Sequence, residues 1–177
     1  VPFHRVEKIS ILVISADVDN CCAIRVQEMF CVCVHFCCAD FHVFVLIGDG
    51  ECNEGTIWEA ALSASKHSLS NLTVILDCNK FQCFGQTEKI TNLEPLGEKW
   101  QSFGFEVREI DGHDTTQIRE AFETVPFSPK KPSLVICHTI KGSGISEMEN
   151  NPSWHHKSKL TEEELKKLYN LLDVENA

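Results

Sequence analysis

Basic residues are scarce in this chain of 177 residues, where 16 Lys and Arg stand against 26 Asp and Glu, for a net charge of −10. Nucleic acids and anionic membranes are bound through clustered Lys and Arg, so this balance argues against both as partners. A local phosphate site stays possible, because backbone amides and a bound metal attract phosphate without net positive charge. The chain also lacks an apolar run long enough to cross a membrane.

The amino-terminal part lacks two further features. No basic segment followed by an apolar one opens the sequence, so we expect no signal peptide and predict a cytoplasmic protein. None of the ten cysteines is part of a CxxC pair, and in the cytoplasm they are expected to be reduced thiols. Cys31, Cys33 and Cys37 would share one strand face with His35, which leaves two alternatives: a zinc site, or buried and inert cysteines.

Glycine is absent before Gly48, so the leading segment has no obvious flexible turn. We therefore divide the chain into a divergent, cysteine-rich segment at 1–42, part of the same domain, and a binding domain at 43–177. The length suits one domain with a substantial core, and the 43% hydrophobic content is typical of a globular protein.

From residue 43 onward, short apolar runs alternate with helical patterns. The pattern predicts strands at 43–47, 72–77, 105–110 and 133–138, and helices at 56–69, 95–103 and 114–124. The helix at 56–69 should have one apolar face made of Ile57, Ala60, Ala61 and Ala64, and Asp114 should be the N-cap of the helix at 114–124. A further strand is expected at 9–14 and a polar loop at 80–94, while the stretch 21–38 is ambiguous between helix and strand. Thr161 and Glu164 predict a capping box for a last helix, whose apolar face would consist of Leu165, Leu168, Leu171 and Leu172. This alternation predicts an α/β fold with an open, mostly parallel sheet flanked by helices.

Two oxygen-bearing side chains follow neighbouring strands of this sheet. Asp49 follows the strand at 43–47, and Asn79 follows the strand at 72–77. A strand, helix, strand unit returns both strand ends to one edge of the sheet, so the two side chains should meet there. Carboxylate and amide oxygens suit Mg²⁺, and Gly50 offers bare backbone to a diphosphate. Taken alone, Asp49 and Asn79 could equally be ordinary turn residues.

Five blocks of sequence carry a more specific signal. They are GDGECNEGTIWEA at 48–60, LDCNK at 76–80, DGHD at 111–114, TIKGSG at 139–144 and MENNPSWH at 148–155. From residue 43 to its end, the chain resembles the N-terminal, thiamine-diphosphate-binding half of transketolase, with these blocks in family order. It also resembles split transketolases, in which the pyrimidine-binding half is a separate polypeptide. Residues 1–42 show no matching motif.

The resemblance implies a cofactor site of thiamine diphosphate and Mg²⁺. Asp49 and Asn79 would bind Mg²⁺ through their side chains, and Phe81 through its backbone carbonyl. Gly50 would offer its amide to the diphosphate, with Gly48 and Glu51 as neighbours in the cofactor-binding turn. Lys141 would border the active site.

The resemblance assigns catalytic roles to two residues. Glu54 matches a glutamate at the subunit interface, and His155 matches a histidine near the diphosphate and the reacting carbon. Each has a plainer alternative: Glu54 as an acid favoured in the first turn of a helix, and His155 as a solvated loop residue. His113 is interpreted as a structural turn residue.

The function implied is transfer of a two-carbon ketol unit between sugar phosphates, a transferase reaction of pentose phosphate and carbohydrate metabolism. The expected partner is the pyrimidine-binding C-terminal half or subunit, in a homodimer or heterotetramer that holds the cofactor between chains. Two alternatives remain. One is a catalytically degenerate pairing or regulatory module, and the other is half of a related thiamine enzyme, such as a deoxyxylulose-phosphate synthase or a 2-oxoacid dehydrogenase.

Overall fold

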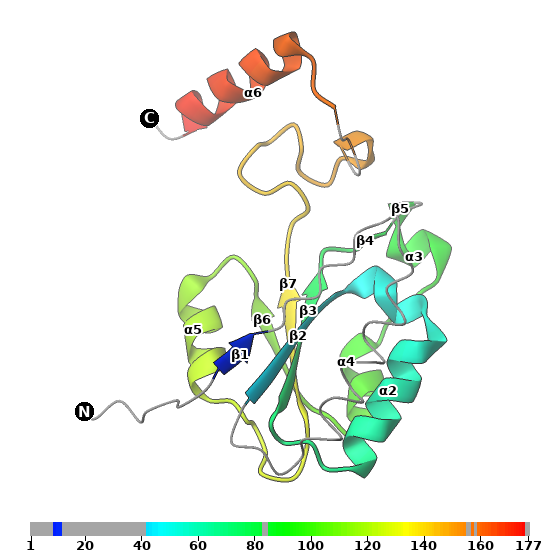
Figure 1. Ribbon diagram of the computed structural model, residues 1–177. Helices are drawn as coiled ribbons and strands as arrows, with labels where there is room; N and C mark the ends of the chain where they lie inside the picture. Colours follow the sequence, from blue (N-terminus) through cyan, green and yellow to red (C-terminus); the bar gives the residue numbers. More distant parts are fainter. Residues whose placement is uncertain (1–8, 12–41, 83–84, 155–156, 158, 176–177) are drawn as a thin grey trace, which may run out of the picture.

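The computed structural model describes residues 9–11, 42–82, 85–154, 157 and 159–175. Its centre is a sheet of five parallel strands in the order β1-β2-β3-β7-β6 (Figure 1). The strands are β1 (Ile9–Ile11), β2 (His42–Gly48), β3 (Leu72–Cys78), β7 (Ser133–His138) and β6 (Glu106–Asp111). The predicted α/β fold with a parallel sheet is therefore confirmed.

The strands at the centre of the sheet are apolar because helices cover both faces. In β7, Leu134 and Ile136 join one core cluster, whereas Val135 between them joins a second cluster on the opposite face. Successive side chains of a strand point to opposite faces, so this split identifies two cores separated by the sheet. A strand buried on both sides reads as a continuous apolar run, as β7 does in the sequence.

The larger core lies under α2 (Gly55–Lys66) and α4 (Leu96–Ser102), and the smaller one under α5 (Thr115–Glu123) (Figure 1). The predicted apolar face of α2 is confirmed, since its small residues are buried against the sheet. These residues are Ile57, Ala60, Ala61 and Ala64. The predicted N-cap of α5 is also confirmed: the Asp114 side chain accepts hydrogen bonds from the N–H groups of Thr116 and Gln117.

The stretch 80–94, which we expected to be a polar loop, contains regular structure. Here β4 (Phe81–Gln82) pairs antiparallel with β5 (Gly85–Gln86), and α3 (Thr87–Ile90) follows. The expectation was wrong because two-residue strands and a single helical turn are too short to leave a periodic pattern in the sequence. This hairpin lies beside the tip of β3 and forms part of the candidate site described below (Figure 1).

The carboxyl-terminal part continues through a 3-10 turn, η2 (Pro152–Trp154), to α6 (Glu162–Glu175). The predicted capping box is confirmed, because the Glu164 N–H donates to Thr161 Oγ1 at 3.2 Å and the Thr161 N–H donates to Glu164 Oε2 at 3.0 Å. Of the apolar face predicted for this helix, Leu168 is buried and Leu165 is exposed.

Three predictions for the amino-terminal part fall on residues outside the described ranges. They concern the end of the first strand at 12–14, the ambiguous stretch at 21–38, and the alternatives for Cys31, Cys33, His35 and Cys37. Among the helices of the described ranges, none is long and apolar enough to span a membrane.

Candidate functional site

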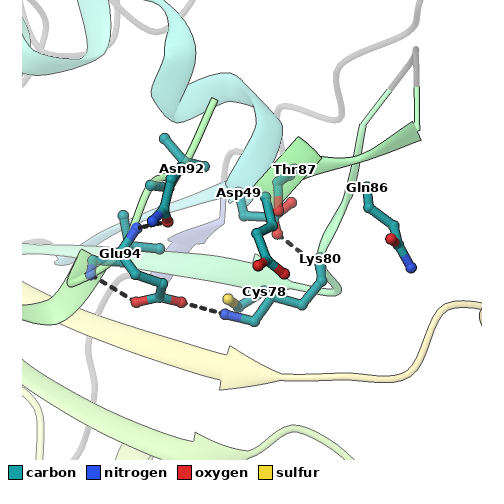
Figure 2. A pocket seen from close by; sticks show the side chains of 10 residues that line it. Asp49, Cys78, Lys80, Gln86, Thr87, Asn92 and Glu94 are labelled. Carbon is teal, nitrogen blue, oxygen red and sulfur yellow. Dashed lines mark hydrogen bonds and ion pairs between the residues drawn. The ribbon is translucent and has the colours of Figure 1, made fainter. Parts of the chain in front are cut away.

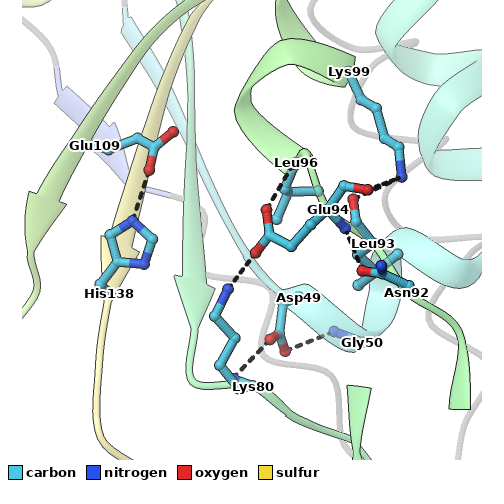
Figure 3. Close-up of polar contacts among 10 residues, drawn as sticks. All are labelled: Asp49, Gly50, Lys80, Asn92, Leu93, Glu94, Leu96, Lys99, Glu109 and His138. Atoms are coloured by element: carbon cyan, nitrogen blue, oxygen red, sulfur yellow. Dashed lines mark hydrogen bonds and ion pairs between the residues drawn. The ribbon is translucent and has the colours of Figure 1, made fainter. Parts of the chain in front are cut away.

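The tips of β2 and β3 meet at the carboxyl edge of the sheet. The strands run in register, with Gly48 opposite Asp77, and β2 leads directly into a 3-10 helix, η1 (Asp49–Asn53). The Lys80 N–H donates to Asp49 Oδ2 at 2.8 Å, so the carboxylate contacts the residue that follows Asn79 (Figure 3). The convergence of the two strand ends, 31 residues apart in sequence, is thus present in the structure.

Asp49 is a buried carboxylate held by backbone donors. Its side chain is 1% exposed, and it accepts hydrogen bonds from the N–H groups of Gly50 and Lys80, both at 2.8 Å. Burial raises its pKa to about 6, and the carboxylate of Asp77 adds to the rise, while the two backbone hydrogen bonds oppose it. A cation bound at this carboxylate would favour its charged form.

Asn79 is also buried, at 9% exposure, and its side chain is held at both ends. Its Oδ1 accepts from the Phe81 N–H at 2.9 Å, and its Nδ2 donates to Asp77 Oδ2 at 3.1 Å. Lys80, between Asn79 and Phe81, has a φ of +65°, a left-handed backbone conformation that residues other than glycine rarely adopt. This turn directs the chain from β3 into β4, beside Asp49.

Gly50 has a packing role in addition to the phosphate-binding role that we predicted for it. A Cβ at this position would lie 2.6 Å from the Cβ of Gln82, closer than packed carbon atoms approach. The bare backbone that we expected for a phosphate is therefore also required by the hairpin. Gln82 is fixed in turn by Asn53, whose Nδ2 donates to Gln82 Oε1 at 2.8 Å.

The remaining residues of the turn hold its backbone. Glu51 Oε2 accepts from the Gly48 N–H at 2.6 Å, and burial raises the pKa of this carboxyl group. Glu54 is half-buried directly before α2, with its N–H donating to the Glu51 carbonyl at 2.9 Å. The cofactor role predicted for Gly48 and Glu51 and the interface role of Glu54 concern ligands and partner chains, and they stay predictions.

No contact among the described residues joins Asp49 to the site residues that we predicted in the carboxyl-terminal loop. Lys141 is half-buried after β7, and its carbonyl accepts the Asn150 N–H at 2.9 Å. His113 accepts the Ile140 N–H on Nε2 at 2.8 Å, which ties the turns after β6 and β7 together and fits its interpretation as a structural residue. His155 lies outside the described residues, so its predicted role stays a prediction.

A cavity of about 360 Å³ adjoins Asp49, between the tip of β3 and the segment 86–96 (Figure 2). Lys80 Nζ reaches across this cavity to the carboxylate of Glu94, which also accepts the Leu96 N–H at 2.9 Å. Lys99 Nζ fixes the same segment by donating to the Leu93 carbonyl at 2.7 Å (Figure 3). The sequence offered no signal for Glu94, because its partner is selected by the tertiary fold.

Burial raises the pKa of the thiols near the site. Cys52, Cys78 and Cys137 are free cysteines, as expected for reduced thiols. Burial raises the pKa of Cys52 to about 12 and that of Cys137 to about 11, and it raises the pKa of Cys78 as well. With pKa values of about 12 and 11, the thiols of Cys52 and Cys137 stay protonated at neutral pH, and a protonated thiol is a poor nucleophile and metal ligand.

Comparison with known proteins decides the family. The family described as "Transketolase, thiamine diphosphate binding domain" matches residues 27–177. The chain belongs to this family. The match begins upstream of residue 43, where the resemblance in the sequence became evident.

Two similar proteins within the family bear the names of transketolase subunits. An apulose-4-phosphate transketolase subunit from Phocaeicola vulgatus is 42% identical over 118 residues, which are 67% of this chain and 42% of that protein. The 6-deoxy-6-sulfo-D-fructose transketolase subunit SqwG of Clostridium sp. is 44% identical over 135 residues, which are 76% of this chain and 49% of that protein. The chain therefore spans less than half the length of either relative.

Solved structures agree with the fold. The transketolase from Campylobacter jejuni superimposes with a TM-score of 0.64 at 29% sequence identity, over 74% of this chain and 21% of that chain. The transketolase from Leishmania mexicana superimposes with a TM-score of 0.65 at 24% identity and covers the same share of each chain. The α/β core described above is therefore the fold of the transketolases.

The side chains at the strand tips fit the cofactor of this family. Asp49 and Asn79 offer carboxylate and amide oxygens, which are hard donors that suit Mg²⁺ rather than a soft metal. Among the residues that the structure describes, no three His, Cys, Asp or Glu side chains gather into a metal cluster. The predicted Mg²⁺ ligands are not a cluster of that kind, because they are one carboxylate, one carboxamide and the backbone carbonyl of Phe81.

Proposed function

We propose that the chain is the diphosphate-binding half of a transketolase-like enzyme, which transfers a two-carbon ketol unit between sugar phosphates with thiamine diphosphate and Mg²⁺. The observation that carries the proposal is the Asp49 carboxylate, buried at the joined tips of β2 and β3 and in contact with the residue after Asn79. In parallel α/β sheets, ligands bind at the carboxyl ends of the strands, where this carboxylate lies.

Each residue of the site has a defined part in this proposal. Asp49 and Asn79 hold Mg²⁺ through their side-chain oxygens, and Phe81 holds it through its carbonyl. The Gly50 N–H, which donates to Asp49 Oδ1 in this structure, would donate to the diphosphate instead, while Glu51 keeps the turn closed through its hydrogen bond to Gly48. When bound, thiamine diphosphate supplies the cleavage and formation of carbon–carbon bonds that convert a ketose and an aldose into an aldose two carbons shorter and a ketose two carbons longer.

The proposal includes a second polypeptide. Two of the similar proteins bear the names of transketolase subunits, and the chain spans 42% and 49% of their lengths. The partner we propose is a pyrimidine-binding C-terminal half, in a homodimer or heterotetramer with Glu54 at the interface. His155 and Lys141 would approach the substrate in that assembly, which we place in the cytoplasm.

The experiment is a ketol-transfer assay with defined sugar phosphates, Mg²⁺ and thiamine diphosphate. The chain is mixed with the product of a neighbouring reading frame that resembles the pyrimidine-binding half, and each protein alone serves as a control. We expect turnover only in the mixture. A mixture that assembles and binds the cofactor, yet transfers no ketol unit from any ketose phosphate, would instead identify a pairing or regulatory module.

A further inference from the structure

At the edge of the candidate site, one side-chain amide has a hydrogen-bond partner for its oxygen but none, among the described residues, for its nitrogen. In Gln82, on β4, the side-chain oxygen accepts a hydrogen bond from Asn53 Nδ2 at 2.8 Å. The side-chain nitrogen of the same amide is buried, and within the described part of the chain it has no hydrogen-bond partner. Burial of an amide donor without an acceptor destabilises a fold, so the exception calls for an explanation.

The position of this amide ties it to the diphosphate-binding turn. A Cβ built on Gly50 would lie 3.3 Å from Gln82 Oε1 and 2.6 Å from Gln82 Cβ. Nε2 is bonded to the same carbon as Oε1, so the whole amide lies beside the backbone of η1. The amide that carries the unpaired donor is thus on β4 and packs against the turn of Gly50, whose N–H the proposed function assigns to the diphosphate.

The contact with Asn53 also orients the amide. Because Asn53 donates to Oε1, the oxygen faces Asn53 and the NH₂ group faces the other way. Asn53 and Gln82 are 29 residues apart in sequence, and they join η1 to the hairpin. This arrangement holds a hydrogen-bond donor in place before any ligand arrives, which lowers the entropy lost on binding.

We propose that Gln82 is a further cofactor-binding residue, whose side-chain NH₂ donates a hydrogen bond to the diphosphate. This inference rests on the proposed function, since it needs a diphosphate at the turn. An anionic oxygen is the acceptor that best compensates a buried donor, because hydrogen bonds to charged groups are roughly twice as strong as neutral ones. Glutamine supplies this donor, whereas glutamate of the same shape would bring a negative charge to the diphosphate.

The test compares two changes at this position in the full chain. Gln82→Glu keeps the shape and the acceptor for Asn53 but removes the donor, and Gln82→Met removes both polar atoms. The matched control is Gln101→Glu, the same chemical change at an exposed residue of α4. Calorimetric titration with thiamine diphosphate at saturating Mg²⁺ measures the dissociation constant, and urea unfolding without ligand measures stability.

We expect Gln82→Met to weaken cofactor binding about 10- to 100-fold, the loss typical of one hydrogen bond to a charged group. Gln82→Glu should weaken binding further through repulsion, and Gln101→Glu should not change it. Without ligand, Gln82→Met should unfold at nearly the same urea concentration as the wild type, because the loss of the exposed Asn53 hydrogen bond is offset by the removal of a buried donor that has no acceptor.

Each other outcome overturns a defined claim. If the wild type binds the cofactor and both variants at 82 bind it equally well, the inference fails while the proposed function stands. If Gln82→Met is clearly less stable without ligand than Asn53→Ala, which removes only the hydrogen bond to Oε1, the amide nitrogen has a structural partner and the inference fails for that reason. If the wild type shows no binding, either alone or mixed with the partner half, the proposed function fails and the inference fails with it.

Discussion

The core beneath α2 and α4 and the tips of β2 and β3 follow different physical rules. The core is apolar and tightly packed: Trp100 is fully buried, with its ring centroid 4.9 Å from that of Phe105 and 5.1 Å from that of Trp58. The strand tips bury polar side chains instead, with a carboxylate of raised pKa at Asp49 and a left-handed φ at Lys80. Burial of apolar surface stabilises the first region, whereas the second carries desolvation and strain of the kind that functional sites retain.

The largest effect on stability should come from the core. Trp100→Ala removes a fully buried indole and its aromatic contacts, which costs about 3–5 kcal/mol of the free energy of unfolding. Urea denaturation measures the loss. The control is Tyr169→Ala on α6, where the side chain is 60% exposed and the change should stay within about 0.5 kcal/mol. Similar losses for the two variants would remove the distinction between core and surface.

Two glycines provide a matched test of the contrast. Gly50→Ala forces a Cβ to within 2.6 Å of the Gln82 Cβ and should destabilise the fold by about 1–3 kcal/mol. Gly55→Ala, in the first turn of α2, meets no atom within 4 Å and should stabilise it by about 0.4–1 kcal/mol. Thermal unfolding of the two variants in the same buffer measures both signs. A Gly50→Ala protein as stable as the wild type would show that the hairpin does not constrain this turn.

The ion pair of Lys80 and Glu94 should contribute little to stability, although it crosses the cavity beside Asp49. Both side chains are about half exposed, at 50% and 55%, and solvent screens such pairs to roughly 1 kcal/mol or less. Glu94→Gln keeps an acceptor for the Leu96 N–H and removes the charge. We expect a loss below about 1 kcal/mol in urea unfolding, and 0.5 M NaCl should reduce it further. A loss of several kcal/mol in the free energy of unfolding would show that solvent does not screen this ion pair.

The smallest expected effect is a pH dependence from His42. Burial lowers the pKa of this imidazole, whose Nε2 shares a hydrogen bond with Thr73 Oγ1 at 2.8 Å. As pH falls below about 6.5, the unfolded chain takes up a proton before the folded one does, so the His42 contribution to stability is present at neutral pH and is lost toward acid. Relative to wild type, His42→Asn should therefore lose less stability between pH 7.5 and 5.5. The exposed His67, changed to Asn, is the control; an equal pH response in both variants would contradict the assignment.

Sequence predicted most of the fold and the convergence of Asp49 with the end of β3, because the elements leave local patterns and their order fixes which strand ends meet. The alanine face of α2, the cap at Asp114 and the apolar run of β7 depend on neighbours a few positions away. The meeting of Asp49 with the end of β3 followed from the topology of parallel sheets, which needs only the order of the elements.

The missed features depend on contacts between distant residues. Gln82 matters because it packs on Gly50 and accepts from Asn53, and Glu94 matters because it meets Lys80. No periodicity links such positions, since tertiary packing selects the partners. The hairpin of β4 and β5 was missed for a related reason: its strands are two residues long and are stabilised by their place beside the tip of β3.

The central claim is that Asp49, at the joined strand tips, holds Mg²⁺ and the diphosphate of the cofactor. The most direct measurement is the melting temperature of the wild type and of Asp49→Ala, each with and without millimolar Mg²⁺ and thiamine diphosphate. Ligand at 100 times its dissociation constant stabilises a protein by about 2.7 kcal/mol, which corresponds to roughly 5–10 °C for a chain of this size. We predict that shift for the wild type and none for Asp49→Ala. An unchanged melting temperature for the wild type, or an equal shift in both proteins, would contradict the account.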